Sequence, residues 1–275
     1  MAIDVSVIMA AYRAGGTIVR AAQSVLAQTG AAVELVLCAD DELDYGALLA
    51  RELPSTAAVR LCRTPSPRSG PSAARNIALG QARGPIIACL DADDAYAPDR
   101  LRRLLPLAER HGAATGPTRE IDPHTGAVRV ARPRREGPSL PVEDICELRM
   151  PFSPVFQRQL CPQGWPAIDF AEDVILNVDL YCAAGGYAFA EAADYHYHLS
   201  PGSRSHSADA LGSARAGYLQ ILDLVEKRGW PEPVKALVRR VFREDLAAVD
   251  RAQASTRDAP SWRAIVRDGC GEREG

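Results

Sequence analysis

The sequence lacks several features that would assign it to a class at once. Its 275 residues contain no apolar run long enough to cross a bilayer, no CxxC pair and no Cys/His spacing typical of zinc. Lysine and arginine form no dominant block, although Arg132, Arg134 and Arg135 make a small basic group, and the formal net charge is −3. These absences argue against a transmembrane segment, a zinc site and nucleic acid as the main partner.

The cysteines also form no disulfide framework. There are 7 of them, scattered along the chain, which favours reduced thiols in a cytosolic protein. The first residues, MAIDVSVIMAAY, carry a charge too early for a signal peptide. We therefore expect a cytoplasmic protein, with peripheral association at the inner membrane face as the alternative. Apolar residues make up 47% of the chain, enough for a sizeable globular core.

Strands and helices alternate along residues 5–111. Continuous apolar runs predict buried strands, and apolar residues at helical spacing predict helices. The expected strands are Val5–Ala10, Val33–Ala39, Ala58–Cys62 and Pro85–Leu90, and the expected helices are Gly15–Gln28, Asp44–Leu53, Ser72–Ala82 and Pro98–His111. This order predicts an α/β fold with a mostly parallel central sheet and helices on both faces.

The second half of the chain follows a different pattern. Turn signals at residues 122–126 predict a hairpin, and residues 113–157 otherwise look irregular. Further on we expect a helix over Ala171–Ala184, short strands at Tyr187–Glu191 and Tyr195–Leu199, and helices at Ala210–Lys227 and Pro233–Ala254. We divide the chain into a main domain over residues 1–206, C-terminal helices over 207–256 and a polar, disordered tail over 257–275. The C-terminal helices either pack within the chain or form a homodimer contact.

Polar side chains follow three of the expected strands. Tyr12, Asp40 and Asp91 each stand just after a strand end. Ligands bind beyond the carboxyl ends of parallel strands, so we expect these side chains to gather along one edge of the sheet.

The segment LDADD places Asp91, Asp93 and Asp94 at one strand end. Like charges this close repel one another, and a divalent cation such as Mg²⁺ or Mn²⁺ removes that cost. Because Mg²⁺ usually completes its shell with substrate phosphates, the segment predicts a metal that carries a phosphorylated ligand. The alternative is a helix N-terminus, where Asp94 would cap the helix that starts near Pro98.

Two other segments place charged side chains near helix starts. Arg75 and Asn76 lie in the first turns of a helix after a small-residue loop, a natural neighbour of a phosphate. Glu172 and Asp173 open a later helix, where a carboxylate at a cleft mouth can take a proton from a hydroxyl. The alternatives are a solvent-facing arginine and a pair of helix-capping acids.

The segment YHYHLSPGSRSHS combines an alternating strand with a turn and a polar loop. The loop carries Ser203, Arg204 and His206, which could close over a diphosphate. The alternative is a solvated loop.

Together these segments resemble the family 2 glycosyltransferases. The resemblance rests on AAYRAGGTI, ADDELD, SAARNIALGQARGPIIACLDADD, AEDVILNVDLY and YHYHLSPGSRSHS, in that order. It implies the GT-A fold, a Rossmann-like fold for nucleotide-diphosphate sugars, in which residues 1–112 form the nucleotide-binding half and 113–206 the acceptor-side half. It also implies an inverting, Mn²⁺- or Mg²⁺-dependent transfer of a sugar from its nucleotide diphosphate, most commonly UDP, to an acceptor hydroxyl.

The resemblance implies roles for individual residues. Asp173 matches the general base, with Glu172 beside it. Residues matching nucleotide contacts are Ala10, Tyr12, Asp40, Arg75, Asp91, Ala92, Asp93, Ser203 and Arg204. Residues implied for the metal are Asp93, Asp91, Asp94 and His206.

The chain departs from the family pattern at three places. Ala10-Ala11-Tyr12-Arg13 replaces Pro-x-Tyr-Asn, Asp40-Asp41-Glu42-Leu43 replaces Asp-Asp-Gly-Ser, and Tyr197-His198 stands where the family often has Tyr-Arg. These departures leave open a nucleotide-sugar-binding protein without turnover. A second alternative, a phosphatase of the haloacid-dehalogenase type with Asp91 as nucleophile, rests on the likeness of LDADD to the nucleophile motif of that class. The sugar, the base and the acceptor are not determined by these residues.

Overall fold

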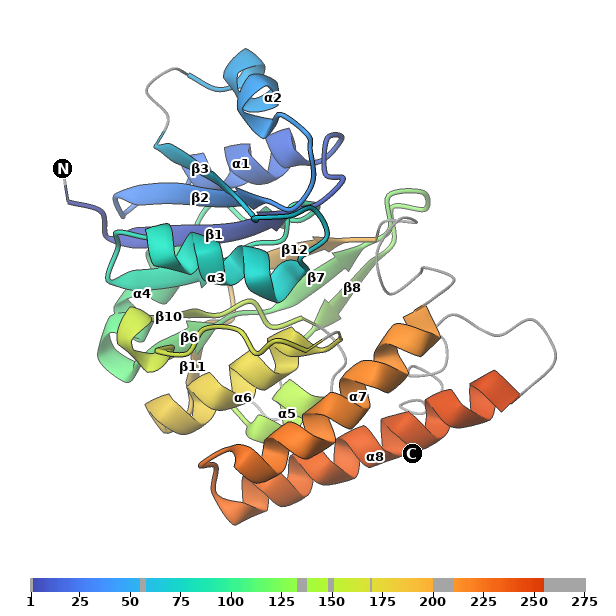
Figure 1. Cartoon of the computed structure of the whole chain (residues 1–275). Helices are drawn as coiled ribbons and strands as arrows, with labels where there is room; N and C mark the ends of the chain where they lie inside the picture. Colours follow the sequence, from blue (N-terminus) through green and yellow to red (C-terminus); the bar gives the residue numbers. More distant parts are fainter. Residues whose placement is uncertain are drawn as a thin grey trace.

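The protein is described by a computed structural model, which covers residues 2–54, 58–132, 138–147, 151–168, 170–199 and 210–254. A central eight-stranded sheet runs through the molecule in the order β3-β2-β1-β4-β10-β6-β11-β9 (Figure 1). Its first half consists of β1 (Val5–Ala11), β2 (Val33–Ala39), β3 (Val59–Arg63) and β4 (Ile86–Cys89). These four strands are parallel, and all lie within one or two residues of the predicted ranges.

The second half makes the sheet a mixed one. β10 (Val155–Gln157) is antiparallel to both β4 and β6 (Ala113–Thr115), whereas β11 (Tyr187–Phe189) is parallel to β6 and antiparallel to β9 (Ser139–Leu140). The sequence did not indicate β10, because three residues are too few to show a periodic pattern. β10 nevertheless lies in the middle of the sheet and joins its two halves.

A second, four-stranded sheet has the order β5-β12-β7-β8. It contains β5 (Ala95–Tyr96), β12 (Tyr195–His198), and the hairpin of β7 (Thr118–Ile121) and β8 (Val128–Ala131). The predicted hairpin is confirmed, with its turn closed by the hydrogen bond from Gly126 N to Asp122 O at 2.8 Å.

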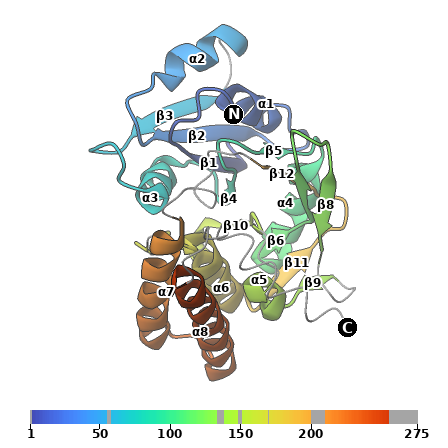
Figure 2. The same ribbon diagram turned by 90° about the vertical axis from the view of Figure 1, so that its right-hand side faces the viewer.

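Helices cover both faces of the central sheet, as predicted (Figures 1 and 2). On one face lie α1 (Ile18–Leu26), α2 (Tyr45–Glu52) and α4 (Arg100–His111), which pack on strand residues such as Val7 and Met9. On the other lie α3 (Pro71–Gln81) and α6 (Glu172–Ala184), with Ile8 in the shared core. Successive strand residues point to opposite faces, so a continuous apolar strand supplies two cores.

The C-terminal helices pack within the chain. α7 (Ala210–Lys227) and α8 (Glu232–Ala254) lie side by side, and α8 also contacts the short helix α5 (Val142–Glu147) (Figure 1). Ile221 and Val225 of α7 are fully buried in the same core as α6, while Leu219 is 44% exposed. Packing within the chain therefore buries most of the apolar face of α7. A homodimer contact through these helices stays a prediction.

Gly217 permits α7 to pack closely against Phe170, which lies just before α6. A Cβ atom on Gly217 would lie 2.6 Å from the Cβ of Phe170, closer than packed atoms can stand. Tyr218 meets the Phe170 ring edge-on at 6.1 Å. No helix in the described part of the chain is long and apolar enough to span a membrane.

Candidate active site

The ends of three neighbouring strands form the site. In the sheet, β1 lies between β2 and β4, and all three run in the same direction. Asp40 N donates to Ala11 O at 2.8 Å, and Leu90 N donates to Ile8 O at 3.2 Å, so the segments after the strands stay adjacent. The predicted gathering of Tyr12, Asp40 and Asp91 at one edge is therefore confirmed.

Arg75 of α3 connects Asp91, which follows β4, with Glu172 at the start of α6. Its Nη2 donates to Asp91 Oδ1 at 2.7 Å, and its Nη1 donates to Glu172 Oε1 at 2.9 Å. The Arg75 side chain is only 12% exposed, so it is not the solvent-facing arginine of the alternative interpretation. Burial by itself would lower the pKa of Arg75, but Asp91 and Glu172 together raise it, and the guanidinium stays charged.

This bridge predicts a strong effect of a conservative substitution. In Arg75→Lys the charge remains, but an ammonium is a single point charge and does not span two carboxylates as a planar guanidinium does. We expect kcat/KM to fall by at least about tenfold, because partly buried Asp91 and Glu172 lose their fixed separation. Steady-state kinetics on Arg75→Lys and on Arg83→Lys, an exposed arginine just after the same helix, measure this effect. Equal activity of the two variants would contradict it.

Asp91–Asp94 form a tight turn, closed by the hydrogen bond from Asp94 N to Asp91 O at 3.1 Å. The Asp91 side chain is 41% exposed, whereas Asp94 is fully buried. Asp94 Oδ2 accepts from the Tyr195 hydroxyl at 2.6 Å, and Oδ1 accepts from His198 N at 2.8 Å. This environment differs from the open one expected for a metal ligand. It also differs from a helix cap, because the N-cap residue of α4 is Asp99.

Asp93 occupies the third position of this turn and is partly buried. Burial, and then the charge of Asp91, raise the pKa of Asp93 to about 6. A guanidinium nitrogen of Arg20 in α1 donates to the main-chain carbonyl of Asp93. The sequence did not single out Arg20, because a lone arginine on an amphipathic helix carries no positional signal.

The carboxylates of Asp91 and Asp93 fit a divalent metal that is shared with a bound ligand. Within the described residues there is no group of three His, Cys, Asp or Glu side chains placed to hold a metal ion. Asp91 and Asp93 nevertheless supply hard oxygen donors whose mutual repulsion a cation would relieve. Such a donor set suits Mg²⁺ or Mn²⁺ with water and phosphate oxygens completing the shell.

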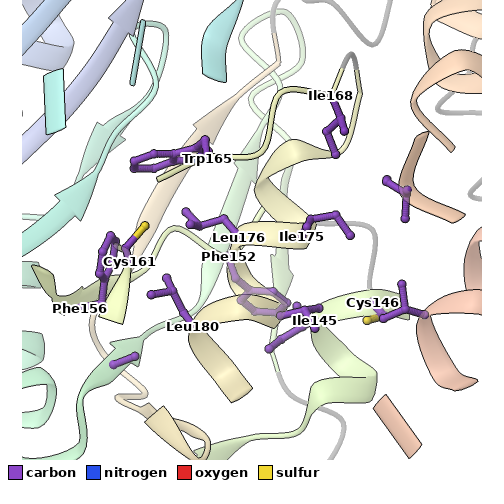
Figure 3. Close-up of a cluster of buried hydrophobic side chains, with 14 of the residues drawn as sticks. Ile145, Cys146, Phe152, Phe156, Cys161, Trp165, Ile168, Ile175, Leu176 and Leu180 are labelled. Atoms are coloured by element: carbon purple, nitrogen blue, oxygen red, sulfur yellow. The ribbon is translucent and has the colours of Figure 1, made fainter. Parts of the chain in front are cut away.

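The N-terminus of α6 carries Glu172 and Asp173 on the other side of Arg75. The helix is anchored by apolar side chains that point into a cluster with the 152–168 segment (Figure 3). Of the residues labelled on α6, Leu176 and Leu180 lie toward Phe152, Phe156 and Trp165, whereas Ile175 points in the opposite direction. The start of α6 has no side-chain cap, because Ala171 occupies the N-cap position. Glu172 and Asp173 therefore do not occupy the N-cap position that the alternative interpretation gave them.

Glu172 and Asp173 differ in their surroundings. Glu172 is ion-paired with Arg75, whereas Asp173 forms no ion pair with a described residue. Burial, and then the charge of Glu172, raise the pKa of Asp173 to about 6. One turn further along α6, Asn177 donates to Asp173 O at 2.9 Å and to Phe152 O at 2.9 Å, which fixes this end of the helix.

Asp40 organises the loop between β3 and α3. Its Oδ1 accepts from Thr64 Oγ1 and Ser69 N, both at 2.8 Å, and its Oδ2 accepts from Gly70 N at 2.9 Å. A carboxylate has about four acceptor positions, and the described residues occupy three of those on Asp40.

Tyr12 lies 42% exposed beside this loop, between two arginines. Arg68 Nε donates to the Tyr12 hydroxyl at 3.0 Å, and the Arg13 guanidinium lies 5.2 Å from the ring centroid. Both arginines have the left-handed backbone conformation, with φ of 62° and 52°. Asp41 accepts from Arg13 N and thereby holds that conformation.

The remaining predicted residues have simpler positions. Ala10 is partly buried near the end of β1, and Ala92 is buried inside the Asp91–Asp94 turn. Ser203, Arg204 and His206 lie outside the described residues, so their predicted roles stay predictions. Asn76 bonds the main chain of Trp165: its Oδ1 accepts from Trp165 N at 2.7 Å, and its Nδ2 donates to Trp165 O at 2.9 Å.

Solved structures define the class of the fold. The chain resembles the crystal structure of S. aureus TarS 1-349 in complex with UDP-GlcNAc, with a TM-score of 0.71 at 17% identity, covering 97% of this chain and 80% of that one. It also resembles the mannosyltransferase PcManGT from Pyrobaculum calidifontis in complex with GDP-Man and Mn²⁺, with a TM-score of 0.66 at 19% identity, covering 99% and 81%. The fold is that of the GT-A glycosyltransferases.

Sequence comparison then gives the family. The family profile described as "Glycosyl transferase family 2" matches residues 6–160. The chain is 33% identical over 240 residues to "Succinoglycan biosynthesis protein ExoO" of Rhizobium meliloti (strain 1021), covering 79% of this chain and 68% of the relative. Over 103 residues it is 40% identical to "UDP-Glc:alpha-D-GlcNAc-diphosphoundecaprenol beta-1,3-glucosyltransferase WfgD" of Escherichia coli, covering 38% of this chain and 40% of the relative.

The chain belongs to glycosyl transferase family 2 and is an enzyme of the glycosyltransferase class that acts on nucleotide sugars. The predicted family, fold and enzyme class are thereby confirmed. The phosphatase alternative is wrong, because the family profile and the fold both assign the chain to glycosyl transfer.

Proposed function

We propose that the protein transfers a sugar from a UDP-sugar to an acceptor hydroxyl with inversion at the anomeric carbon, using Mn²⁺ or Mg²⁺. The observation that supports this proposal most strongly is the position of Arg75 between the carboxylates of Asp91 and Glu172. Its guanidinium fixes Asp91 on the donor side and Glu172 on the acceptor side, within 2.9 Å of each. Asp93 and Asp173 are left as the carboxylates available for a metal and for a base.

Asp173 is the general base of the proposed reaction. Inversion is a single in-line displacement, so it requires one base for the incoming hydroxyl and stabilisation of charge on the leaving diphosphate. Glu172 is neutralised by Arg75, whereas Asp173 has no such partner among the residues that the structure describes. Its pKa of about 6 leaves it ionised at neutral pH and makes it a better proton acceptor than an ordinary aspartate.

Asp93 and Asp91 are the proposed carboxylates toward the metal and the nucleotide. A divalent ion bound there supplies positive charge to the leaving diphosphate. We assign Asp94 a supporting role, because both of its carboxylate oxygens accept internal hydrogen bonds. Ser203, Arg204 and His206 are proposed to approach the diphosphate from the loop that follows β12.

Asp40 and Tyr12 are the proposed contacts of the nucleobase. The remaining acceptor position on Asp40 Oδ2 suits a base that presents an N–H, such as the imide N–H of uracil. The exposed Tyr12 ring supplies a stacking surface. UDP is the first choice, since the TarS structure contains UDP-GlcNAc and WfgD is named for UDP-Glc.

A sugar hydroxyl on a growing glycan is the proposed acceptor. The relatives named above are a succinoglycan biosynthesis protein and a glucosyltransferase acting on a diphosphoundecaprenol-linked sugar. We infer that this chain takes a related lipid-linked oligosaccharide, and that it works at the inner membrane face of the cell.

A thermal-shift screen tests the donor and the metal together. UDP, GDP, dTDP and their sugars would be added with and without Mn²⁺, and with EDTA in excess. We expect UDP to raise the melting temperature only when Mn²⁺ is present, since bound ligand stabilises the native state by mass action. A shift by GDP alone would change the proposed base, and a shift unaffected by EDTA would overturn metal dependence. Metal-dependent binding without product from any acceptor would favour the non-catalytic alternative.

The raised pKa of Asp173 predicts a pH profile. Below pH 6 the carboxyl becomes protonated and loses its function as a base, so kcat should fall about tenfold per pH unit there and level off above. The Mn²⁺ bound with the donor offsets the negative charge of the diphosphate, so we expect the inflection to stay near pH 6. The measurement is kcat against pH at saturating donor and Mn²⁺. A kcat that stays constant down to pH 5 would exclude Asp173 as the base.

A further inference from the structure

We propose that Tyr195 of β12 is the positioning residue of the metal site: its hydroxyl holds both ends of the Asp91–Asp94 turn and so aims Asp93. The inference rests on the metal-dependent function proposed above and assigns a residue to it from the second sheet. Tyr195 lies 101 residues after Asp94 in the sequence, yet the two side chains meet at 2.6 Å.

The Tyr195 hydroxyl makes two contacts with the turn. It donates its proton to Asp94 Oδ2 at 2.6 Å, and it accepts the hydrogen of Asp91 N at 3.2 Å. Asp91 and Asp94 are the first and last residues of the turn, which is closed by its own main-chain hydrogen bond of 3.1 Å. One oxygen atom therefore fixes both ends of the segment, and Asp93 lies between them.

The burial of Asp94 makes such a support necessary. Asp94 is fully buried, so its two carboxyl oxygens need hydrogen-bond partners within the protein. The hydroxyl of Tyr195 and the main-chain N–H of His198 supply one hydrogen bond to each oxygen. Without Tyr195, one oxygen would lose its partner and the turn would lose an internal anchor.

Tyr195 is itself rigidly held. It is fully buried, and its register in the second sheet is set by pairing with Tyr96 of β5. The two rings meet edge-on, with centroids 6.0 Å apart. The guanidinium of buried Arg100 lies 5.5 Å from the Tyr195 ring and 5.2 Å from the Tyr96 ring. Because the Tyr195 ring is fixed, its hydroxyl keeps one position, and the Asp91–Asp94 turn is positioned by its hydrogen bonds to that hydroxyl.

A residue that supports a metal-binding carboxylate without touching the metal affects turnover through the affinity of the site for the metal. Partners that orient metal-binding carboxylates typically change metal affinity by about ten- to a hundredfold when removed. The variant Tyr195→Phe keeps the ring and its packing and removes only the hydroxyl. The matched control is Tyr96→Phe, which removes a buried hydroxyl from the neighbouring ring. That hydroxyl donates to Cys89 O at 2.5 Å and touches none of the three carboxylates.

The experiment measures the Mn²⁺ dissociation constant in the presence of UDP, by electron paramagnetic resonance of free Mn²⁺, together with melting temperatures. We expect Tyr195→Phe to weaken Mn²⁺ binding by at least about tenfold and Tyr96→Phe by less than about threefold. We also expect excess Mn²⁺ to restore the turnover of Tyr195→Phe, which a general loosening of the fold would not allow.

The possible outcomes separate this inference from the function on which it rests. If wild-type protein binds Mn²⁺ and Tyr195→Phe binds it within twofold of wild type, the positioning role is wrong and metal dependence stands. Equal weakening in both variants also overturns the positioning role, since it shows a general effect of removing a buried hydroxyl. If wild-type protein with UDP binds no Mn²⁺, metal dependence and the positioning role both fail.

Discussion

Asp173→Asn is expected to reduce kcat by about a hundredfold or more while leaving the affinity for the donor unchanged. Removal of a general base typically costs about two to four powers of ten in rate. Asn is nearly isosteric with Asp and retains a side-chain oxygen, so the start of α6 and the Arg75–Glu172 ion pair should persist. The loss should therefore appear in kcat, with the UDP- and Mn²⁺-dependent thermal shift retained.

The same substitution should not destabilise the fold. Because the folded-state pKa of Asp173 is raised above its ordinary value, the ionised side chain costs folding free energy above pH 6. Asn removes that cost and the repulsion from Glu172. We expect the melting temperature at pH 7.5, without ligand, to stay equal or rise, as is common when a strained active-site charge is removed.

Asp179→Asn is the matched control for this experiment. Asp179 lies on the same helix, and burial also raises its pKa. It bonds Trp230 Nε1 at 2.8 Å and pairs with Arg228 at 3.0 Å, as part of the contact between α6 and the C-terminal helices. Its variant should lose some stability and keep full turnover. Full activity of Asp173→Asn would assign the base to another residue.

Asp93→Asn should abolish the metal-dependent part of donor binding. The amide has no charge to offset that of the metal, so Mn²⁺ affinity should fall by about a hundredfold or more and kcat/KM should fall by a similar factor. Calorimetric titration of Mn²⁺ into the UDP complex, with turnover measured at several metal concentrations, checks both effects.

The control for this variant is Asp99→Asn. Asp99 lies six residues along the chain, its side chain is 44% exposed, and among the described residues it pairs with Arg102 and Arg103 on the surface of α4. Exposed pairs of this kind contribute little to stability, so the variant should resemble wild type in every measurement. If Asp93→Asn keeps the Mn²⁺-dependent shift produced by UDP, the metal must be held elsewhere, and His206, which follows β12 in the sequence, is the next residue to test.

Much of the fold follows from local sequence. The strands β1, β2 and β4 were indicated by runs such as Val33–Ala39, because a strand buried on both faces is continuously apolar and ends where polar residues begin. The helix α7 was predicted with its observed bounds, Ala210–Lys227. Parallel order places all strand ends on one edge, so the gathering of Tyr12, Asp40 and Asp91 followed from the same pattern.

The elements that escaped prediction are short or depend on distant partners. β10 and β5 contain three and two residues, and each exists only because a neighbouring strand supplies its hydrogen bonds. The family resemblance named Asp94 among the metal residues, yet the structure surrounds it with Tyr195 and His198, residues of a strand that no local pattern connects to it.

The sequence by itself determined the α/β alternation, the family and the set of acidic residues, because apolar periodicity and short motifs are properties of neighbouring positions. Only the tertiary structure decided which of these acids share a partner. Arg75 reaches Glu172 across 97 positions, and Tyr195 reaches Asp94 across 101. The physical reason is that the pKa, charge balance and orientation of a carboxylate depend on atoms within a few ångströms, and folding brings those atoms from remote parts of the chain.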